Sequence, residues 1–200
     1  MPYLIGITGN SGCGKSTALA ILREAGYRVM DFDAYSIAVI QEAGNPVRAR
    51  LEEILGETVA DNGVVNFKKI GAYFDTHVDE EIRFDRWYQE YLGGRIRSVL
   101  AQQCGDEPVF VDMPLVRQRN MTGAFDLIWI IRADLNTCRR RIRHRNQYDD
   151  TKIEYLITRS LVTDEIYQQP VMIIHNDGTL EEYRRDILAA AVSICNTRKQ

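Results

Sequence analysis

The stretch that most constrains this chain is Gly9–Ser16, which reads Gly-Asn-Ser-Gly-Cys-Gly-Lys-Ser. It follows an apolar run, Tyr3–Ile7, and precedes a helix-like run, Thr17–Leu22. A strand, a glycine-rich loop ending in Lys-Ser and a helix, in this order, are typical of a P-loop, whose backbone N–H groups surround nucleotide phosphates. A glycine-rich turn before an ordinary helix is the alternative, but the flanking strand and helix favour the nucleotide loop.

The residue types in this loop predict how the phosphates are bound. Lys15 reaches the β- and γ-phosphates, and the Ser16 hydroxyl is a ligand for Mg²⁺. The start of the following helix adds the positive end of its dipole. The residues expected to hold the nucleotide are Gly9, Asn10, Ser11, Gly12, Cys13, Gly14, Lys15, Ser16 and Thr17.

Composition and charge exclude several other classes of protein. The chain has 200 residues, of which 45% are hydrophobic and 26% are charged, which suits one globular domain with room for an inserted subdomain. A net charge of −3 does not indicate nucleic-acid binding, although a local basic patch stays open as an alternative. No apolar run approaches the roughly 20 residues of a membrane span, and no signal-peptide pattern begins the chain.

The cysteines predict a reducing environment. Cys13, Cys104, Cys138 and Cys195 are widely separated and form no C-x-x-C pair, so we expect neither a disulfide framework nor a zinc site, and we expect a cytoplasmic protein. Cys13 stands at a helix N-terminus, which favours a thiolate and predicts redox sensitivity. The alternative is a small side chain that fills a variable loop position.

Apolar runs that alternate with helical patterns predict an α/β fold with a parallel sheet and right-handed crossovers. The five runs typical of strands are Tyr3–Ile7, Tyr27–Met30, Pro108–Asp112, Leu127–Ile131 and Val171–His175. His175, at the end of the last run, is more readily explained as structural than as catalytic. Residues 40–103 are mostly helical and lie between two of these strands, a placement that suits a substrate-covering insertion.

A glycine pair, Gly93-Gly94, lies within the longest helical pattern of the insertion, Asp79–Gln103. Each glycine in a helix interior costs roughly 1 kcal/mol relative to alanine. We therefore expect either a helix break at this point or close packing that needs the missing side chains.

Two carboxylates, Asp31 and Asp33, follow the second predicted strand. Open α/β folds bind their ligands at the carboxyl ends of the strands, so both are candidates for contacting a substrate hydroxyl. In a strand their side chains point the same way, unless a turn begins between them. Asp33 also precedes the helical run Ala34–Ile40, so it is a candidate N-cap as well, and one residue can do both.

Further candidates follow the third and fourth strands. Asp112 ends its strand as a Walker B carboxylate does when it holds Mg²⁺. The helix after the fourth strand is rich in arginine, which is usually a solvated face but in phosphoryl transfer neutralises charge on the transferred group. Arg141 and Arg145 are four residues apart and so share a helix face.

Short motifs continue along nearly the whole chain in collinear order: Asp31-Phe32-Asp33, Ile37-Ala38, Asp61-Asn62-Gly63, Phe74, Met113-Pro114-Leu115, Arg141, Arg145 and Asn176–Glu182. Together they resemble the dephospho-coenzyme A kinase family. The resemblance implies transfer of the ATP γ-phosphoryl group to the ribose 3′-hydroxyl of dephospho-coenzyme A, the last step of coenzyme A biosynthesis. It also implies a three-layer P-loop kinase domain over residues 1–200, with a helical substrate-binding insertion at 40–103 and an Arg-bearing lid at about 137–165.

The resemblance also assigns roles, with ATP and Mg²⁺ as cofactors and a small molecule as acceptor. Asp33 is expected to orient the acceptor hydroxyl and to receive its proton. The catalytic candidates are Lys15, Asp33, Arg141 and Arg145, and the metal candidates are Ser16 and Asp112.

The chain departs from the family pattern on its acceptor side. Gly93-Gly94 replaces a His-Pro pair, Val116-Arg117 stands where an acidic residue is common, Ser160 occupies a glutamine position, and Val171-Met172 replaces an acidic pair. A nucleotide, or a modified base in DNA, therefore stays open as the acceptor. A third hypothesis is an ATP-binding regulator without transferase activity; the Asn-Lys-x-Asp run of a GTPase is absent.

Overall fold

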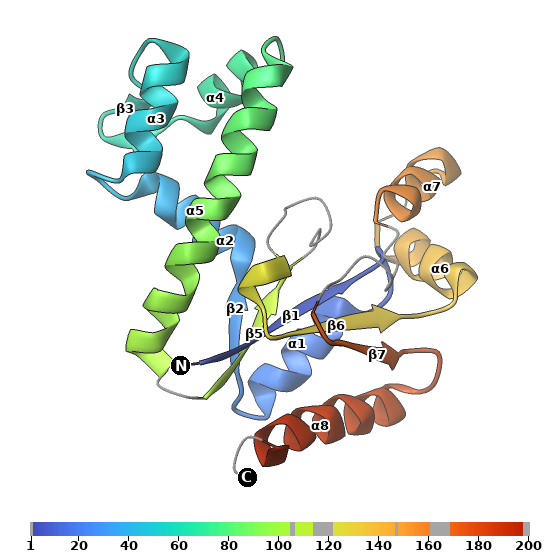
Figure 1. Ribbon diagram of the computed structural model, residues 1–200. Helices are drawn as coiled ribbons and strands as arrows, with labels where there is room; N and C mark the ends of the chain where they lie inside the picture. Colours follow the sequence, from blue (N-terminus) through green and yellow to red (C-terminus); the bar gives the residue numbers. More distant parts are fainter. Residues whose placement is uncertain (1, 105–106, 114–121, 147, 161–168, 198–200) are drawn as a thin grey trace.

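The computed structural model describes residues 2–104, 107–113, 122–146, 148–160 and 169–197 (Figure 1). Pro114, Leu115, Val116 and Arg117 of the sequence analysis lie outside the described residues, as does the 161–165 part of the predicted lid. The helices are α1 (Lys15–Glu24), α2 (Phe32–Gln41), α3 (Pro46–Leu55), α4 (Phe67–Phe74), α5 (Val78–Cys104), α6 (Leu135–Asn146), α7 (Asp150–Arg159) and α8 (Leu180–Thr197), with a short 3₁₀ turn at Thr122–Ala124.

A five-stranded parallel sheet forms the centre of the molecule, as the apolar runs predict. Its strands are β1 (Tyr3–Gly9), β2 (Arg28–Asp31), β5 (Pro108–Asp112), β6 (Leu127–Arg132) and β7 (Val171–His175), in the order β2-β5-β1-β6-β7. Ile7 on β1 and Asp31 on β2 both stand in register with Asp112 on β5. The P-loop and both candidate carboxylate segments therefore leave the sheet at one edge.

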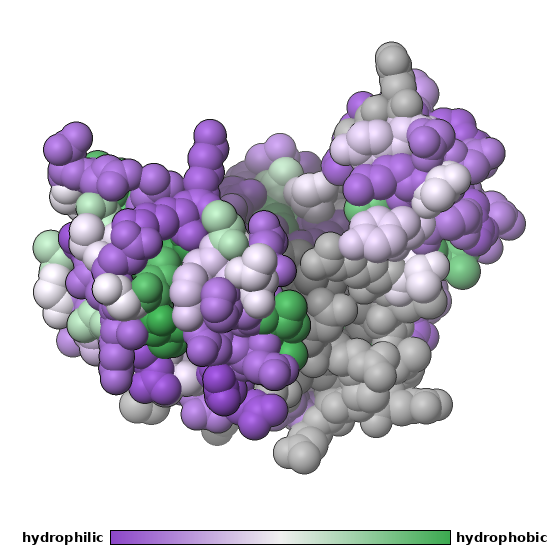
Figure 2. Space-filling view, turned by 90° about the horizontal axis from the view of Figure 1, so that it is seen from above, coloured by the Kyte–Doolittle hydropathy of each residue, from purple (hydrophilic) through white to green (hydrophobic). Residues whose placement is uncertain are grey.

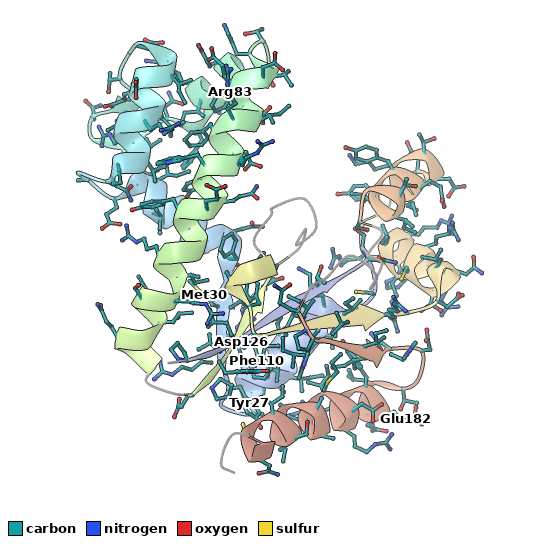
Figure 3. All side chains as sticks on the ribbon, viewed as in Figure 1. Tyr27, Met30, Arg83, Phe110, Asp126 and Glu182 are labelled. Atoms are coloured by element: carbon teal, nitrogen blue, oxygen red, sulfur yellow. The ribbon has the colours of Figure 1, made fainter. Side chains whose placement is uncertain are left out.

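The sheet has a helical layer on each face, because its strands alternate their side chains between two cores. On β6, Ile128 and Ile130 face the core shared with α2 and α5, whereas Trp129 faces the core shared with α1 and α8. Phe110 lies in this second core, 5.0 Å from Trp129 between ring centroids (Figure 3). The three-layer α/β fold expected from the sequence is confirmed.

The segment between β2 and β5 holds α2 to α5 and a small antiparallel hairpin, β3 (Ala60–Asp61) and β4 (Val64–Val65). The hairpin turns at Asn62 and Gly63, both with positive φ, which the Asp-Asn-Gly motif predicts. In Figure 1 these elements rise above the carboxyl edge of the sheet, and α5 returns the chain to the amino edge, where β5 begins. The predicted insertion at 40–103 remains a prediction as a substrate-binding unit.

The helix α5 continues through Gly93-Gly94, so the expected helix break was wrong. Close packing does not explain Gly94 either, because a Cβ placed there would meet nothing within 4 Å. Tertiary contacts hold the helix on both sides of the pair: Tyr88 donates to the Ser36 carbonyl at 2.6 Å, and Arg97 pairs with Asp126 at 3.2 Å. These anchors outweigh the helix-propensity cost of the glycines, roughly 1 kcal/mol each.

Replacing Gly94 with alanine is expected to stabilise the protein by about 0.5–1 kcal/mol, since the methyl group meets open space and alanine loses less backbone entropy in a helix. Thermal unfolding should show a rise in Tm of roughly 1–4 °C for a domain of this size. Gly71→Ala on α4 is the matched control, because a Cβ there also meets nothing within 4 Å, and a similar rise is expected. A lower Tm for Gly94→Ala alone would contradict this account.

The face shown in Figure 2 is dominated by hydrophilic side chains, with fewer hydrophobic ones among them. The large exposed apolar residues between β2 and β5 are Ile37, Val64, Phe67, Val78 and Ile82. Scattered apolar residues of this kind are ordinary on soluble domains. Among the described helices, none combines the length and the apolar character that crossing a membrane requires.

Candidate active site

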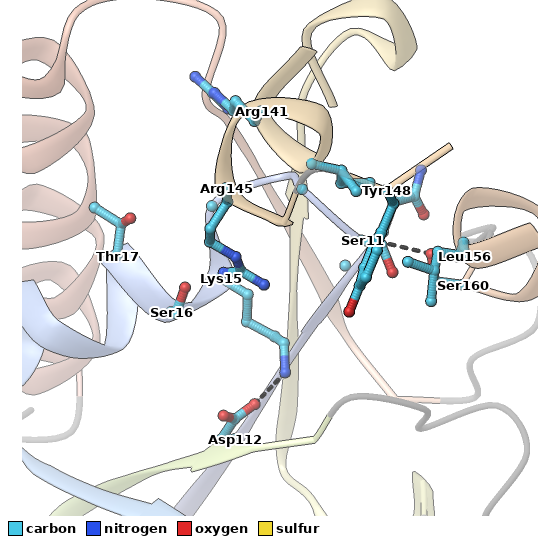
Figure 4. A pocket seen from close by; sticks show the side chains of 15 residues that line it. Ser11, Lys15, Ser16, Thr17, Asp112, Arg141, Arg145, Tyr148, Leu156 and Ser160 are labelled. Carbon is cyan, nitrogen blue, oxygen red and sulfur yellow. Dashed lines mark hydrogen bonds and ion pairs between the residues drawn. The ribbon is translucent and has the colours of Figure 1, made fainter. Parts of the chain in front are cut away.

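A cavity of about 660 Å³ lies between the P-loop and the helices α6 and α7 (Figure 4). It is lined by Gly9, Asn10, Ser11, Gly12, Gly14, Lys15, Ser16, Thr17, Asp112, Arg141, Ile142, Arg145, Tyr148, Leu156 and Ser160. The tertiary structure thus brings together residues from three distant parts of the chain. Of the predicted site residues, Cys13 and Asp33 do not line this cavity.

The shape of the P-loop depends on glycine at two positions where φ is left-handed. Gly12 has a φ of 79°, and a Cβ there would lie 2.7 Å from the Cys138 carbonyl oxygen on α6. Gly14 has a φ of 101°, and a Cβ there would lie 2.1 Å from the Asn176 side-chain nitrogen. Any other residue at these positions would be strained and would also clash. The loop therefore packs directly against α6 and against the turn after β7.

The Cys13 side chain points away from the cavity into the core, with 1% of its surface exposed. Burial raises the pKa of this thiol to about 11, so the thiol stays neutral at physiological pH. Desolvation outweighs the helix N-terminus, and the expectation of a favoured thiolate was wrong. The structure supports the alternative of a small side chain that fills space. The Cys13 backbone N–H donates to the Asn10 carbonyl at 3.1 Å and shapes the loop.

Lys15 and Asp112 form an ion pair inside the cavity (Figure 4). Their side chains are 19% and 25% exposed, so solvent screens them only in part. The exposed Ser16 hydroxyl lies on the same side of the loop (Figure 4). One hydroxyl and one carboxylate beside a phosphate-binding loop suit Mg²⁺, which takes its other ligands from phosphates and water.

Arg141 and Arg145 on α6 both line the cavity, as their four-residue spacing predicts. The Arg145 side chain points toward Lys15, whereas Arg141 points away from it (Figure 4). Arg141 donates from Nη2 to the Asn176 backbone carbonyl at 3.2 Å. Its Nη1 is buried and has no hydrogen-bond partner within the described part of the chain. The two arginines therefore bring positive charge to different parts of one cavity.

Asp31 and Asp33 stand in different elements, because β2 ends at Asp31 and α2 begins at Phe32. Asp31 is the N-cap of α2, with its Oδ1 accepting from Ala34 N at 2.9 Å, so the expectation that Asp33 caps this helix was wrong. A turn does begin between the two carboxylates, and they do not share a strand face. Asp33 is exposed in the first turn of α2, two residues beyond the strand end that stands in register with Asp112.

Sequence reasoning did not assign site roles to Tyr148 and Ser160, which lie on either side of α7. Ser160 is 8% exposed, and its hydroxyl accepts from Ser11 N at 2.7 Å and donates to the Leu156 carbonyl at 2.7 Å. Tyr148 extends its ring into the cavity beside Ser11 (Figure 4). The one sequence signal for Ser160 was that it occupies a glutamine position of the resembled family. No local pattern could show that it meets Ser11, because the two residues are far apart in sequence.

A family model described as dephospho-CoA kinase matches residues 3–182. A dephospho-CoA kinase from Streptococcus pyogenes serotype M3 is 28% identical over 199 residues, covering 98% of this chain and 100% of the relative.

Solved structures share the fold. A Thermus thermophilus protein superposes with a TM-score of 0.72 at 22% identity, covering 96% of this chain and 97% of its own. A dephospho-CoA kinase from Campylobacter jejuni superposes with a TM-score of 0.69 at 16% identity, covering 99% of this chain and 100% of its own.

Proposed function

This chain belongs to the dephospho-CoA kinase family, and we propose that its P-loop cavity transfers the γ-phosphoryl group of ATP to the ribose 3′-hydroxyl of dephospho-CoA, the last step of coenzyme A biosynthesis. One observation supports the assignment of the site above the others. The P-loop, a strand-terminal Asp112 and the lid residue Arg145 line a single cavity, although they are far apart in sequence. Phosphoryl transfer requires a loop that binds the nucleotide phosphates, a carboxylate that binds the metal and an arginine that neutralises charge on the transferred group.

The donor half of the site consists of the P-loop, Lys15, Ser16 and Asp112. Lys15 binds the β- and γ-phosphate oxygens, and in doing so exchanges its Asp112 partner for phosphate. Ser16 and Asp112 are the residues that would hold Mg²⁺, whose chemistry is to neutralise charge on the phosphate oxygens. Once Lys15 binds phosphate, the Asp112 carboxylate would be available as a ligand for Mg²⁺. The ion pair keeps both groups at the place where they are needed.

The acceptor half depends on Asp33. A ribose hydroxyl is a weak nucleophile at neutral pH, so a carboxylate that receives its proton lowers the barrier. As the new bond forms between the 3′-oxygen and the γ-phosphorus, the bond from that phosphorus to the β–γ bridging oxygen breaks and ADP leaves. Arg145, with Arg141, stabilises the negative charge on the transferred group. The position of Asp33 at the carboxyl edge, beyond the Asp112 end of the sheet, suits this task.

The decisive experiment compares acceptors side by side. ADP release from Mg²⁺-ATP should require dephospho-CoA, with product phosphorylated on the 3′-oxygen and turnover that varies little with salt. Deoxynucleotides and hydroxymethylated DNA should give no release above the acceptor-free rate. Faster release with either of these would contradict the proposed acceptor, and polymer binding would reveal itself by a steep loss with salt. ATP binding without transfer to any acceptor would instead favour a regulator.

The environment that we propose for this enzyme is the cytoplasm. Cys13, Cys138 and Cys195 are free thiols, which suits a reducing compartment. Its partner in the reaction is a small-molecule acceptor.

A further inference from the structure

The turn between β7 and α8 contacts the P-loop, and the mechanism above gives it no task. Asn176, directly after β7, is 6% exposed, and its backbone N–H donates to the Arg132 carbonyl at 2.7 Å. On the other side of the turn, Thr179 N donates to Glu182 Oε2 at 2.8 Å and Glu182 N donates to Thr179 Oγ1 at 3.2 Å, which caps α8 (Figure 3). The sheet and the helix together therefore hold Asn176 in one place.

The Asn176 side chain orients a peptide unit of the P-loop. Its Nδ2 donates to the Cys13 carbonyl at 2.8 Å in a fully buried hydrogen bond. In a trans peptide unit the carbonyl and the following N–H point in opposite directions. The bond to Cys13 therefore directs the Gly14 N–H away from Asn176, toward the cavity that Gly14 lines.

Tyr183 on α8 orients the next peptide unit in the same way. Its hydroxyl donates to the Gly14 carbonyl at 3.2 Å, which directs the Lys15 N–H to the opposite side. The ring is 2% exposed, and burial raises the pKa of the phenol, so the hydroxyl keeps its proton and remains a donor. Asn176 and Tyr183 thus bind the consecutive carbonyls of Cys13 and Gly14. These two hydrogen bonds align the N–H groups of Gly14 and Lys15.

Asn176 also positions the arginine of the lid. Its backbone carbonyl accepts from Arg141 Nη2 at 3.2 Å, while Nη1 of the same guanidinium is buried without a hydrogen-bond partner in the described ranges. A buried guanidinium N–H without a partner is costly unless an anion meets it. Asn176 therefore contacts both the loop peptide that contains the Gly14 N–H and the side chain of Arg141.

We propose that Asn176 is a positioning residue for phosphoryl transfer: its amide orients the Gly14 N–H toward the phosphates, and its carbonyl fixes Arg141 in the part of the cavity away from Lys15. This inference rests on the proposed function, and it adds a group that itself touches neither ATP nor the acceptor. Tyr183 supports the same alignment one residue later.

The test is Asn176→Asp, which keeps the shape of the side chain but places a carboxylate opposite the Cys13 carbonyl. We expect kcat/KM for ATP to fall roughly tenfold to a hundredfold, less than the loss of a direct oxyanion donor gives, while KM for dephospho-CoA stays unchanged. Tyr183→Phe should lower kcat/KM for ATP by a smaller factor. The matched control is Asp177→Asn. The Asp177 side chain is exposed and accepts from Asp134 N at 2.7 Å, and the asparagine oxygen can accept the same hydrogen bond. This variant should leave the kinetics unchanged.

A wild-type kcat/KM for ATP in folded Asn176→Asp would overturn the proposal. A higher KM for dephospho-CoA together with a lower Tm would overturn it too, because they would indicate general damage. Calorimetric titration with Mg²⁺-ADP separates this inference from the proposed function. Weaker ADP binding by Asn176→Asp supports the inference even where the wild type fails to phosphorylate dephospho-CoA, and that failure counts against the proposed function alone.

Discussion

Lys15→Ala is expected to lower kcat/KM for ATP on the order of a thousandfold, the largest effect of any single substitution in this chain. Two causes act together. The β- and γ-phosphates lose their ammonium partner, and the Asp112 carboxylate, which pairs with Lys15, is left without its counter-charge beside them. Where no Mg²⁺ is bound at Asp112, repulsion between that carboxylate and the phosphates weakens nucleotide binding further.

Steady-state kinetics with dephospho-CoA and calorimetry with metal-free ADP would measure the two causes separately. Adding Asp112→Asn to Lys15→Ala should restore part of the affinity for metal-free ADP by removing the repulsion, but it should restore no turnover. Lys68→Ala is the control, because this lysine is exposed on α4 and does not line the cavity. A Lys15→Ala enzyme that keeps turnover near the wild-type rate would refute the role of Lys15.

Asp33→Asn is expected to lower kcat roughly a hundredfold or more, the usual contribution of a positioned general base. The affinity for Mg²⁺-ADP should not change, because Asp33 does not line the nucleotide cavity. The amide keeps the size of the side chain and loses only its ability to receive the proton of the acceptor hydroxyl. The expected signature is thus a loss of kcat without a loss of nucleotide binding.

Asp31→Asn is a closely matched control for this variant. Asp31 caps α2 by accepting from Ala34 N at 2.9 Å, and asparagine caps helices as well as aspartate does. Near wild-type kcat is therefore expected. The assignment of the base to Asp33 is wrong if Asp33→Asn keeps wild-type kcat, or if Asp31→Asn loses as much.

Local patterns were sufficient for the framework of the fold. The five strands follow from short apolar runs, of which β1, β5 and β6 are buried along most of their length, and each predicted run overlaps an observed strand. The turn at Asn62-Gly63 and the cap formed by Thr179 and Glu182 also follow from neighbouring residues. In each case the groups that interact are close in sequence, so the spacing of residue types contains the information.

Where a sequence pattern is compatible with two local structures, the sequence did not show which of them forms. The helical run after Asp33 indicated Asp33 as the N-cap, but α2 begins at Phe32 and Asp31 caps it, because β2 leaves its pairing with β5 at Asp31. The glycine pair in α5 indicated a break or close packing, but contacts from α2 and from Asp126 hold the helix continuous. Each glycine lowers the stability of the helix by about 1 kcal/mol relative to alanine, and the tertiary contacts outweigh this cost.

The sequence by itself determined that Gly9–Ser16 is a phosphate-binding loop between a strand and a helix, because glycine spacing and the flanking apolar runs are local properties. Only the tertiary structure decided what surrounds that loop. Asp112 meets Lys15, Ser160 meets Ser11 and Asn176 meets Cys13 across separations of 97, 149 and 163 residues. The parallel sheet makes these meetings, since it brings the carboxyl ends of distant strands to one edge.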